Sequence, residues 1–354
     1  MKTRKEISVI VHGPEAVDSG LALRVMEAAS SLGHVQARVG GATAVAAVID
    51  AGLEGTISIG DRELPSMAIT RALQGSDLVL LVNHGKGRVS ALAFGRLVMS
   101  RVPRTSIPVV QVDDGLTVIW SGEDTSLAGV PALFGNEVLD LRGEPTLPAD
   151  HGRRLSGVVP GENIWIDGHV IGRATREEVL ICQGPAGELQ VEGIELKPTG
   201  VQRLGRFDLP SAIIRSGQVR RTRATPRCLR SKGVVACLID HCAEEAVYRC
   251  RDAAYVVTVG DDTSKIAAAL LYRLGVPVIA ITDGDEDGIS SDDILYPGSY
   301  VFRLLPGNDD LVGAMIAAEH FQGGHRVELR SGIEEMAGRV RAACGDRLLW
   351  ERRF

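Results

Sequence analysis

The sequence lacks the features that mark several large classes of protein. No apolar run approaches the roughly 18 residues of a membrane span, and the N-terminus leads into a strand-like segment rather than a signal-peptide core. The six cysteines form no CxxC pair, which fits reduced thiols better than a disulfide scaffold. With 39 basic against 45 acidic residues, there is no excess of positive charge to indicate a generally basic nucleic-acid binder. We therefore expect a cytoplasmic protein without a membrane partner.

The composition supplies enough apolar material for several folded domains. The 354 residues are 45% hydrophobic and 24% charged, with a net charge of −6. These values lie far from the low-hydrophobicity, high-charge regime of disordered chains. At about 150 residues per domain, the length predicts two to three domains.

The hydrophobic periodicity predicts an α/β fold with two Rossmann-like parallel-sheet lobes and a small antiparallel β module between them. Short β-branched runs alternate with helical stretches in both lobes, which is typical of βαβ units. In the first lobe we expect strands at 7–11, 35–39, 77–82 and 107–112, and helices near 15–32, 43–51, 65–74 and 89–101. In the second lobe we expect strands at 234–239, 255–259, 276–281 and 300–304, and helices at 243–251, 262–274 and 310–321.

Composition changes along the chain predict its domain boundaries. Two apolar alternations flank Asp167-Gly168, a strong hairpin signal, and mark the β module. Pro, Gly and charged residues before it are typical of a linker. The predicted organisation is an N-terminal domain over 1–139, a linker over 140–157, a β-barrel-like module over 158–205, a basic connector over 206–233, a C-terminal domain over 234–324 and a helical tail over 325–354.

The loops that follow the strands of the first lobe predict a binding site for an anion. In open parallel sheets, ligands bind outside the carboxyl ends of the strands. Glycines let backbone N–H groups approach a phosphate or carboxylate, and Lys86 and Arg88 add positive charge. The spacing matches neither a Walker loop nor GxGxxG, so ordinary turns with exposed cations remain the alternative. The candidate ligand-binding residues are His12, Glu15, Gly41, Asn83, His84, Gly85, Lys86 and Arg88.

The strand ends of the second lobe carry acids instead. Carboxylates gathered at one edge repel one another unless a cation intervenes, and Mg²⁺ prefers such oxygen ligands. Capping of the helix that begins near Asp261 is one alternative, and a solvated acidic turn is another. The candidate metal ligands are Asp240, Asp261, Asp283, Asp285 and Asp287.

Two further segments raise a nucleic-acid hypothesis. The pattern Asp283-Gly-Asp285-Glu-Asp287-Gly resembles the DxDxDG motif of toprim domains, which holds Mg²⁺ for phosphodiester chemistry, but Asp240 stands where those domains have a glutamate. The basic stretch Arg215–Lys232 would suit a polyanion, although it lacks aromatic residues for stacking. An exposed connector is the simpler interpretation of that stretch.

Four segments in order resemble a known family. They are VIVHGPEAVDSG, LLVNHGKGR with LAFGR after it, PGENIWIDG, and VGDDTSKIAAALLYRLGVPVIAITDGDEDG. Together they resemble a family of archaeal proteins, found mainly in methanogens, that is catalogued as a domain of unknown function. The resemblance extends to about residue 322 and implies a cytoplasmic archaeal protein. It implies no activity and no catalytic residues.

Opposed cationic and acidic edges predict a Mg²⁺-dependent enzyme or a nucleotide-handling protein, which binds a nucleotide or phosphorylated metabolite with Mg²⁺. Such edges suit phosphoryl or nucleotidyl transfer or hydrolysis, but whether the protein is an enzyme stays open. A non-catalytic regulatory or partner-docking protein is the first alternative. Toprim-like nucleic-acid processing is the second. The sequence indicates neither the oligomeric state nor the substrate.

Overall fold

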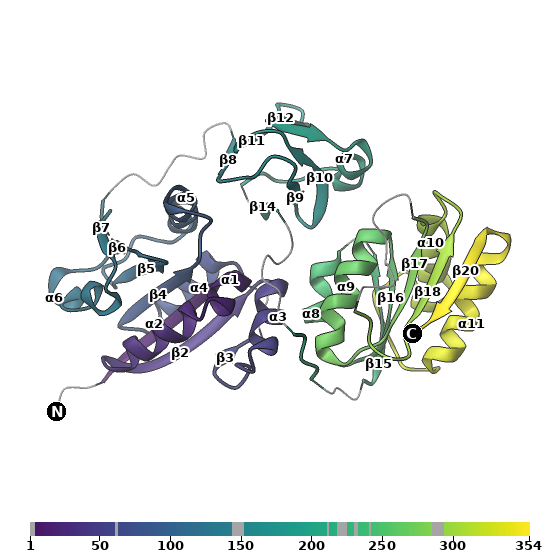
Figure 1. The fold of residues 1–354 in the computed structure, drawn as a ribbon, viewed down its shortest axis with the longest axis horizontal. Coiled ribbons are helices and arrows are strands. Elements are labelled where there is room, and N and C mark those ends of the chain that lie inside the picture. The colour runs from purple at the N-terminus through teal and green to yellow at the C-terminus, as the bar shows by residue number, and fades with distance from the viewer. Residues whose placement is uncertain are drawn as a thin grey trace. The chain divides into compact units, whose positions relative to one another are not determined.

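The computed structural model describes residues 4–60, 63–143, 152–210, 212–217, 225–229, 233–240, 242–284 and 294–354, without the side chain of Glu244. The chain divides into two compact units, residues 1–224 and 225–354, each with its own strands and helices (Figure 1). The division falls within the predicted basic connector. The predicted α/β fold class is confirmed, since each unit contains a largely parallel sheet and the first also contains small antiparallel sheets.

The first unit is built on a sheet with the order β3-β2-β1-β4-β5-β6-β7 among the described residues. Strands β1 to β5 are parallel, whereas β6 runs antiparallel to β5. The strands are β1 (Lys5–His12), β2 (Gly33–Gly40), β3 (Ile57–Ser58), β4 (Leu78–Asn83), β5 (Val109–Asp113), β6 (Leu116–Ser121) and β7 (Glu137–Asp140). The central strand β4 is buried along its whole length, so its near-continuous apolar sequence is typical of a parallel sheet covered on both faces.

Helices cover both faces of this sheet. One face packs Ile10, Val79 and Leu81 against apolar side chains of α4 and α5. The helices are α1 (Pro14–Asp18), α2 (Leu21–Ser30), α3 (Ala42–Asp50), α4 (Pro65–Ala72), α5 (Arg88–Met99) and α6 (Asp124–Leu127), with a 3₁₀ turn at Pro131–Phe134. The helix predicted over 15–32 is broken in two, because Gly20 adopts a left-handed φ of 73°.

The β module completes the first unit. Its hairpin prediction is confirmed, because β9 and β10 pair antiparallel across Asp167 and Gly168, whose φ angles are 48° and 88°. Both residues have positive φ, which suits the right-handed twist of the flanking strands. The elements are β8 (Arg153–Ser156), β9 (Asn163–Ile166), β10 (His169–Ala174), β11 (Glu178–Gln183), β12 (Leu189–Glu192), β13 (Ile194–Leu196), α7 (Pro198–Leu204) and β14 (Ile214–Ser216).

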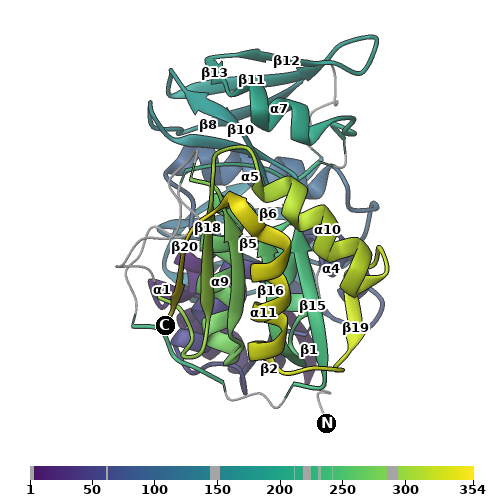
Figure 2. The same ribbon diagram turned by 90° about the vertical axis from the view of Figure 1, so that its right-hand side faces the viewer.

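The second unit has a sheet with the order β19-β15-β16-β17-β18-β20 within its described part. The inner four strands are parallel and both edge strands are antiparallel to them. Figure 2 shows α10 and α11 side by side over these strands. The elements are β15 (Val235–Asp240), a 3₁₀ turn (Ala243–Glu245), α8 (Ala246–Arg249), β16 (Ala253–Val259), α9 (Asp261–Leu274), β17 (Val278–Thr282), β18 (Tyr300–Leu304), α10 (Asp309–Phe321), β19 (Arg326–Glu328), α11 (Ile333–Cys344), a second 3₁₀ turn (Gly345–Arg347) and β20 (Leu348–Arg353).

The segment predicted as a helical tail does contain the expected helix, α11. However, it also supplies both edge strands of the second sheet, β19 beside β15 and β20 beside β18. Side chains of α11, including Met336, Ala337 and Val340, lie in the same core as Phe302 and Ile316. Residues 325–354 are therefore an integral part of the second unit.

Candidate functional site

The order of the first sheet reverses between β1 and β4. From β1 the chain proceeds to β2 on one side, and from β4 it proceeds to β5 on the other. Ligands of open α/β folds bind outside the carboxyl ends of the strands at such a switch point. His12, the last residue of β1, is in register with both Gly40 on β2 and Asn83 on β4. The predicted residues at these three strand ends therefore lie at one edge.

His12 is neutral at this edge. Its ring stacks on Phe94 of α5, with centroids 4.2 Å apart and planes inclined by 19°. Burial lowers the pKa of His12 from 6.5 to about 4, and the nearby negative charge of Glu15 only partly opposes this shift. At neutral pH, His12 therefore offers a ligand a hydrogen-bonding imidazole rather than a positive charge.

Asp113, which the sequence analysis did not select, organises the loop after β4. The buried carboxylate accepts hydrogen bonds from Asn83 Nδ2 at 2.7 Å and from the backbone N of Gly85 at 3.0 Å. Its Oδ1 also accepts the backbone N of Asp114 at 2.9 Å. Asp113 ends β5, so the parallel sheet itself brings it beside the end of β4. The only sequence signal for this role is an acid at the end of a buried strand.

The loop after β4 combines tight packing with an unmet hydrogen-bonding atom. A Cβ at Gly85 would lie 3.0 Å from the backbone N of Ala91, so this position leaves little room for a side chain. Next to it, Nδ1 of His84 is buried and has no hydrogen-bond partner among the described residues. An unmet polar atom of this kind costs about 1–3 kcal/mol. A ligand group or an ordered water would satisfy it.

The two predicted cations of this loop are both engaged in ion pairs. Lys86 Nζ donates to Glu162 Oε2 at 2.6 Å and to Ser216 Oγ at 3.1 Å, and its side chain is only 20% exposed. This contact ties the loop to the β module. Arg88 forms a two-pronged pair with Glu137, and the side chains are 48% and 57% exposed. The pair lowers the pKa of Glu137.

Three helices begin at this edge directly after glycines. The residues before α1, α3 and α5 are Gly13, Gly41 and Gly87, which have no side chain to cap the helix starts. At α5, Ser90 Oγ accepts the backbone N–H of Gly87 at 3.0 Å, and the N–H groups of the first helical turn stay uncapped. Gly13 and Gly41 have φ angles of 79° and 90°, a region that favours glycine. A Cβ at Gly41 would meet no atom within 4 Å, so this glycine faces open space. The N-terminal N–H groups of α3 and α5 are therefore open to an anion.

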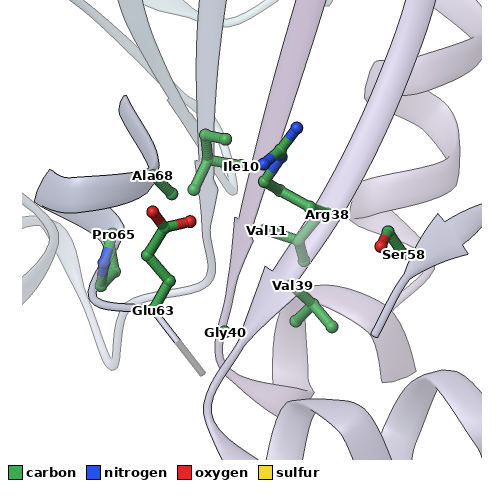
Figure 3. Close-up of a pocket in the computed structure, with 9 residues that line it drawn as sticks. All are labelled: Ile10, Val11, Arg38, Val39, Gly40, Ser58, Glu63, Pro65 and Ala68. Atoms are coloured by element: carbon green, nitrogen blue, oxygen red, sulfur yellow. The ribbon is translucent and has the colours of Figure 1, made fainter. Parts of the chain in front are cut away.

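A pocket that the sequence analysis missed lies on the α4 side of the same sheet. Figure 3 shows Arg38 and Glu63 approaching it from two sides, with Ser58 of β3 nearby. A Cβ at Gly40 would lie 2.3 Å from the carbonyl O of Glu63, so glycine here lets the segment before α4 cross closely over the end of β2. The lining residues are Ile10, Val11, Arg38, Val39, Gly40, Ser58, Glu63, Pro65 and Ala68.

The second unit brings some of the predicted metal ligands near other charged groups rather than into a metal cluster. Asp261 lies 3.8 Å from Arg303, and Asp283 accepts a hydrogen bond from the backbone N of Gly307. Burial and the charge of Asp283 raise the pKa of Asp309 to about 7. No group of three or more His, Cys, Asp or Glu side chains is arranged to hold a metal within the described residues.

The remaining predicted ligands of the acidic edge are Asp240, Asp285 and Asp287. Asp240 is exposed at the end of β15. Asp285 and Asp287, and with them most of the toprim-like motif, lie outside the described residues. The basic stretch Arg215–Lys232 is described only in part; there, Arg215 stacks over Trp165 at 4.6 Å.

Comparisons with known proteins agree with the resemblance of the four segments. The chain is 31% identical over 329 residues to an uncharacterized protein of the methanogen Methanocaldococcus jannaschii, which covers 88% of this chain and 90% of the relative. No solved structure matches the chain. In the described part of the chain, no helix is long and apolar enough to cross a membrane. Residues 9–324 match a family described as uncharacterized proteins conserved in archaea (DUF2117), and the chain belongs to this family.

Proposed function

We propose that the first unit binds an anionic small molecule, a nucleotide or phosphorylated metabolite, at the carboxyl edge between β1 and β4. The observation that carries the proposal is the switch point itself, where His12 and Asn83 are in register and α5 begins directly after Gly87. Helix N-termini attract anions through their free N–H groups and their dipoles. The unmet Nδ1 of His84 supports the same location.

The ion pairs of the loop after β4 suggest different roles for Lys86 and Arg88. An exposed pair such as Arg88–Glu137 contributes only about 0–1 kcal/mol, so a phosphate can displace Glu137 at little cost. Lys86 is more enclosed and has two partners, which favours a role in holding the loop against the β module. Arg88 is therefore the cation that we assign to the ligand. Asp113 fixes the loop through Asn83 and Gly85 and does not itself touch the anion.

The proposal covers binding of the anion, and a reaction on it stays a prediction. Among the described acids, Asp261 is paired with Arg303, and Asp283 accepts the Gly307 N–H, so they form no vacant set of oxygen ligands. A Mg²⁺ site would depend on Asp285 and Asp287, which lie outside the described residues. Phosphoryl or nucleotidyl transfer, and the cytoplasmic location, likewise stay predictions. No observation favours the regulatory or nucleic-acid alternatives over binding at this edge.

A thermal-shift titration of the full chain tests the proposal. The probes are inorganic phosphate, pyrophosphate and ADP, each with and without Mg²⁺, because a ligand of the folded state stabilises by RT ln(1 + [L]/Kd). We expect at least one probe to raise the melting temperature, and His84→Ala to weaken its binding about twofold to thirteenfold, as the loss of one hydrogen bond of about 0.5–1.5 kcal/mol implies.

The matched control is His34→Ala. His34 lies on β2, where its exposed ring pairs with Glu6 at 2.9 Å, and its replacement should leave binding unchanged. If wild type and His84→Ala bind the probe equally well, the ligand does not bind at the edge between β1 and β4. A shift that appears only with Mg²⁺ would support the metal prediction.

A further inference from the structure

Arg38 is a cation for which the described residues supply no counter-charge. Its side chain lines the pocket on the α4 side of the sheet and is only partly exposed. Among the described residues, it takes part in no hydrogen bond or ion pair. Charged groups removed from water are normally paired, because desolvation of an unpaired charge is costly. The guanidinium also presents several N–H donors in a fork that matches phosphate or carboxylate.

The other charged group of the pocket does not neutralise Arg38. Glu63 is 14% exposed and pairs with Arg71 on α4 at 2.7 Å. Because Arg71 balances the charge of Glu63, Arg38 is the uncompensated charge among the described residues of the pocket. Its remaining walls are apolar side chains of β1, β2 and α4, which strengthen a charge interaction beside them. The enclosed space is about 10 Å³, so an anionic group would meet Arg38 at the mouth of the pocket rather than inside it. The hydroxyl of Ser58 adds one further polar group.

The pocket opens on the same face of the sheet as the site between β1 and β4. Arg38 is in register with Ile10, and two residues further along β1 His12 is in register with Asn83. Register partners in a parallel pair project to the same side, and side chains two residues apart on a strand do so as well. Arg38, His12 and Asn83 therefore share one face near one edge of the sheet.

From this placement we infer that Arg38 binds a second anionic group, a phosphate or carboxylate, of the ligand held between β1 and β4. This inference rests on the proposed function and narrows its ligand class. The ligand is a molecule with two separated anionic groups, one at the start of α5 and the other at Arg38.

Chemical labelling of the wild-type chain tests the inference without relying on a variant. Hydroxyphenylglyoxal reacts with accessible guanidinium groups, and mass spectrometry of peptides assigns the modified residue. We expect Arg38 to be modified, and inorganic phosphate at ten times its Kd to slow this modification about tenfold, since protection follows 1 + [L]/Kd. Arg24 is the internal control, because it lies exposed on α2 and donates to the backbone O of Ser19 at 2.9 Å.

Two variants separate this inference from the proposed function. Arg38→Gln should weaken phosphate binding at the pocket, whereas Arg24→Gln should not. If phosphate fails to protect Arg38 while His84→Ala is stabilised less than wild type by the probes, the Arg38 inference is wrong and the proposed site between β1 and β4 is supported. If phosphate protects Arg38 equally in wild type and His84→Ala, and His84→Ala loses no binding to any probe, Arg38 binds anions at a separate site, and both the proposed site between β1 and β4 and the shared ligand are wrong. If phosphate does not protect Arg38 and His84→Ala binds the probes as wild type does, both the Arg38 inference and the proposed site are wrong.

Discussion

Among single residues, Asp113 is the one on which the geometry of the β4 loop depends most directly. Its carboxylate accepts three N–H groups, from Asn83, Gly85 and Asp114. In Asp113→Asn the new amide would face these donors with one oxygen instead of two. We expect the free energy of unfolding to fall by about 1.5–3 kcal/mol, the usual contribution of hydrogen bonds to a charged group. Urea unfolding measures this loss.

The control for this prediction is the neighbouring residue. Asp114 is exposed, and its replacement in Asp114→Asn should change stability by less than about 0.5 kcal/mol. Equal stability of Asp113→Asn and wild type would show that the buried carboxylate does not hold the loop.

Residue roles of this kind are the part of the site that the sequence predicts least well. His12 and Asn83 end strands and His84 follows one, and the rule for open parallel sheets was sufficient to select them. The role of Asp113 comes from its contact with Asn83 on the neighbouring strand β4. The role of Arg38 comes from its place in the pocket on the α4 side of the sheet. One sequence does not contain the strand order that creates those contacts. Nor did it indicate that Lys86 would pair with Glu162, which lies 76 residues further along the chain.

At the scale of elements, the packing of α5 on the sheet positions Phe94 beside His12. Gly95 makes this close approach possible, because a Cβ there would lie 1.9 Å from Gln111 Oε1 and 2.5 Å from the ring of Trp120. Gln111 cannot easily move, since it donates to the backbone O of Ala91 and accepts from Trp120 Nε1. We expect Gly95→Ala to destabilise the first unit by about 1–3 kcal/mol through overpacking, despite the higher helix propensity of alanine.

A second helical glycine provides the matched control. Gly338 lies within α11, and a Cβ there would meet only the end of the Arg341 side chain, at 3.9 Å. Gly338→Ala should therefore stabilise the chain by about 0.4–1 kcal/mol. Calorimetry measures the change in stability of both variants, which should be a loss for Gly95→Ala and a gain for Gly338→Ala. A stabilising Gly95→Ala would mean that α5 is free to move away from the sheet.

The long elements were predicted well and the short edge strands were not. Strands β1, β4 and β5 carry near-continuous apolar runs because they are covered on both faces. The short edge strands β7 and β19 have no buried residue, so they leave little hydrophobic pattern to read. The two edge strands of the second sheet flank α11, and their place depends on pairing with β15 and β18 rather than on local sequence.

At the scale of the whole molecule, the division into two compact units predicts separate responses to pH. In the first unit, the pKa of His12 is lowered from 6.5 to about 4, so the unfolded chain binds more protons between these values and stability falls as the pH decreases through them. In the second unit, the pKa of Asp309 is raised from 3.8 to about 7. There the folded chain binds more protons, and stability rises as the pH decreases.

Scanning calorimetry at pH 5, 6 and 7 should therefore resolve two transitions that move in opposite directions. Each shifted group contributes up to about 2 kcal/mol between pH 7 and pH 5, since one pKa unit corresponds to about 1.36 kcal/mol. His12→Gln should remove the acid-induced loss from the first transition, and Asp309→Asn should remove the acid-induced gain from the second. A single transition would show that the two units unfold as one cooperative structure. Two transitions that shift in the same direction with pH would contradict the assignment of opposite pH responses to the two units.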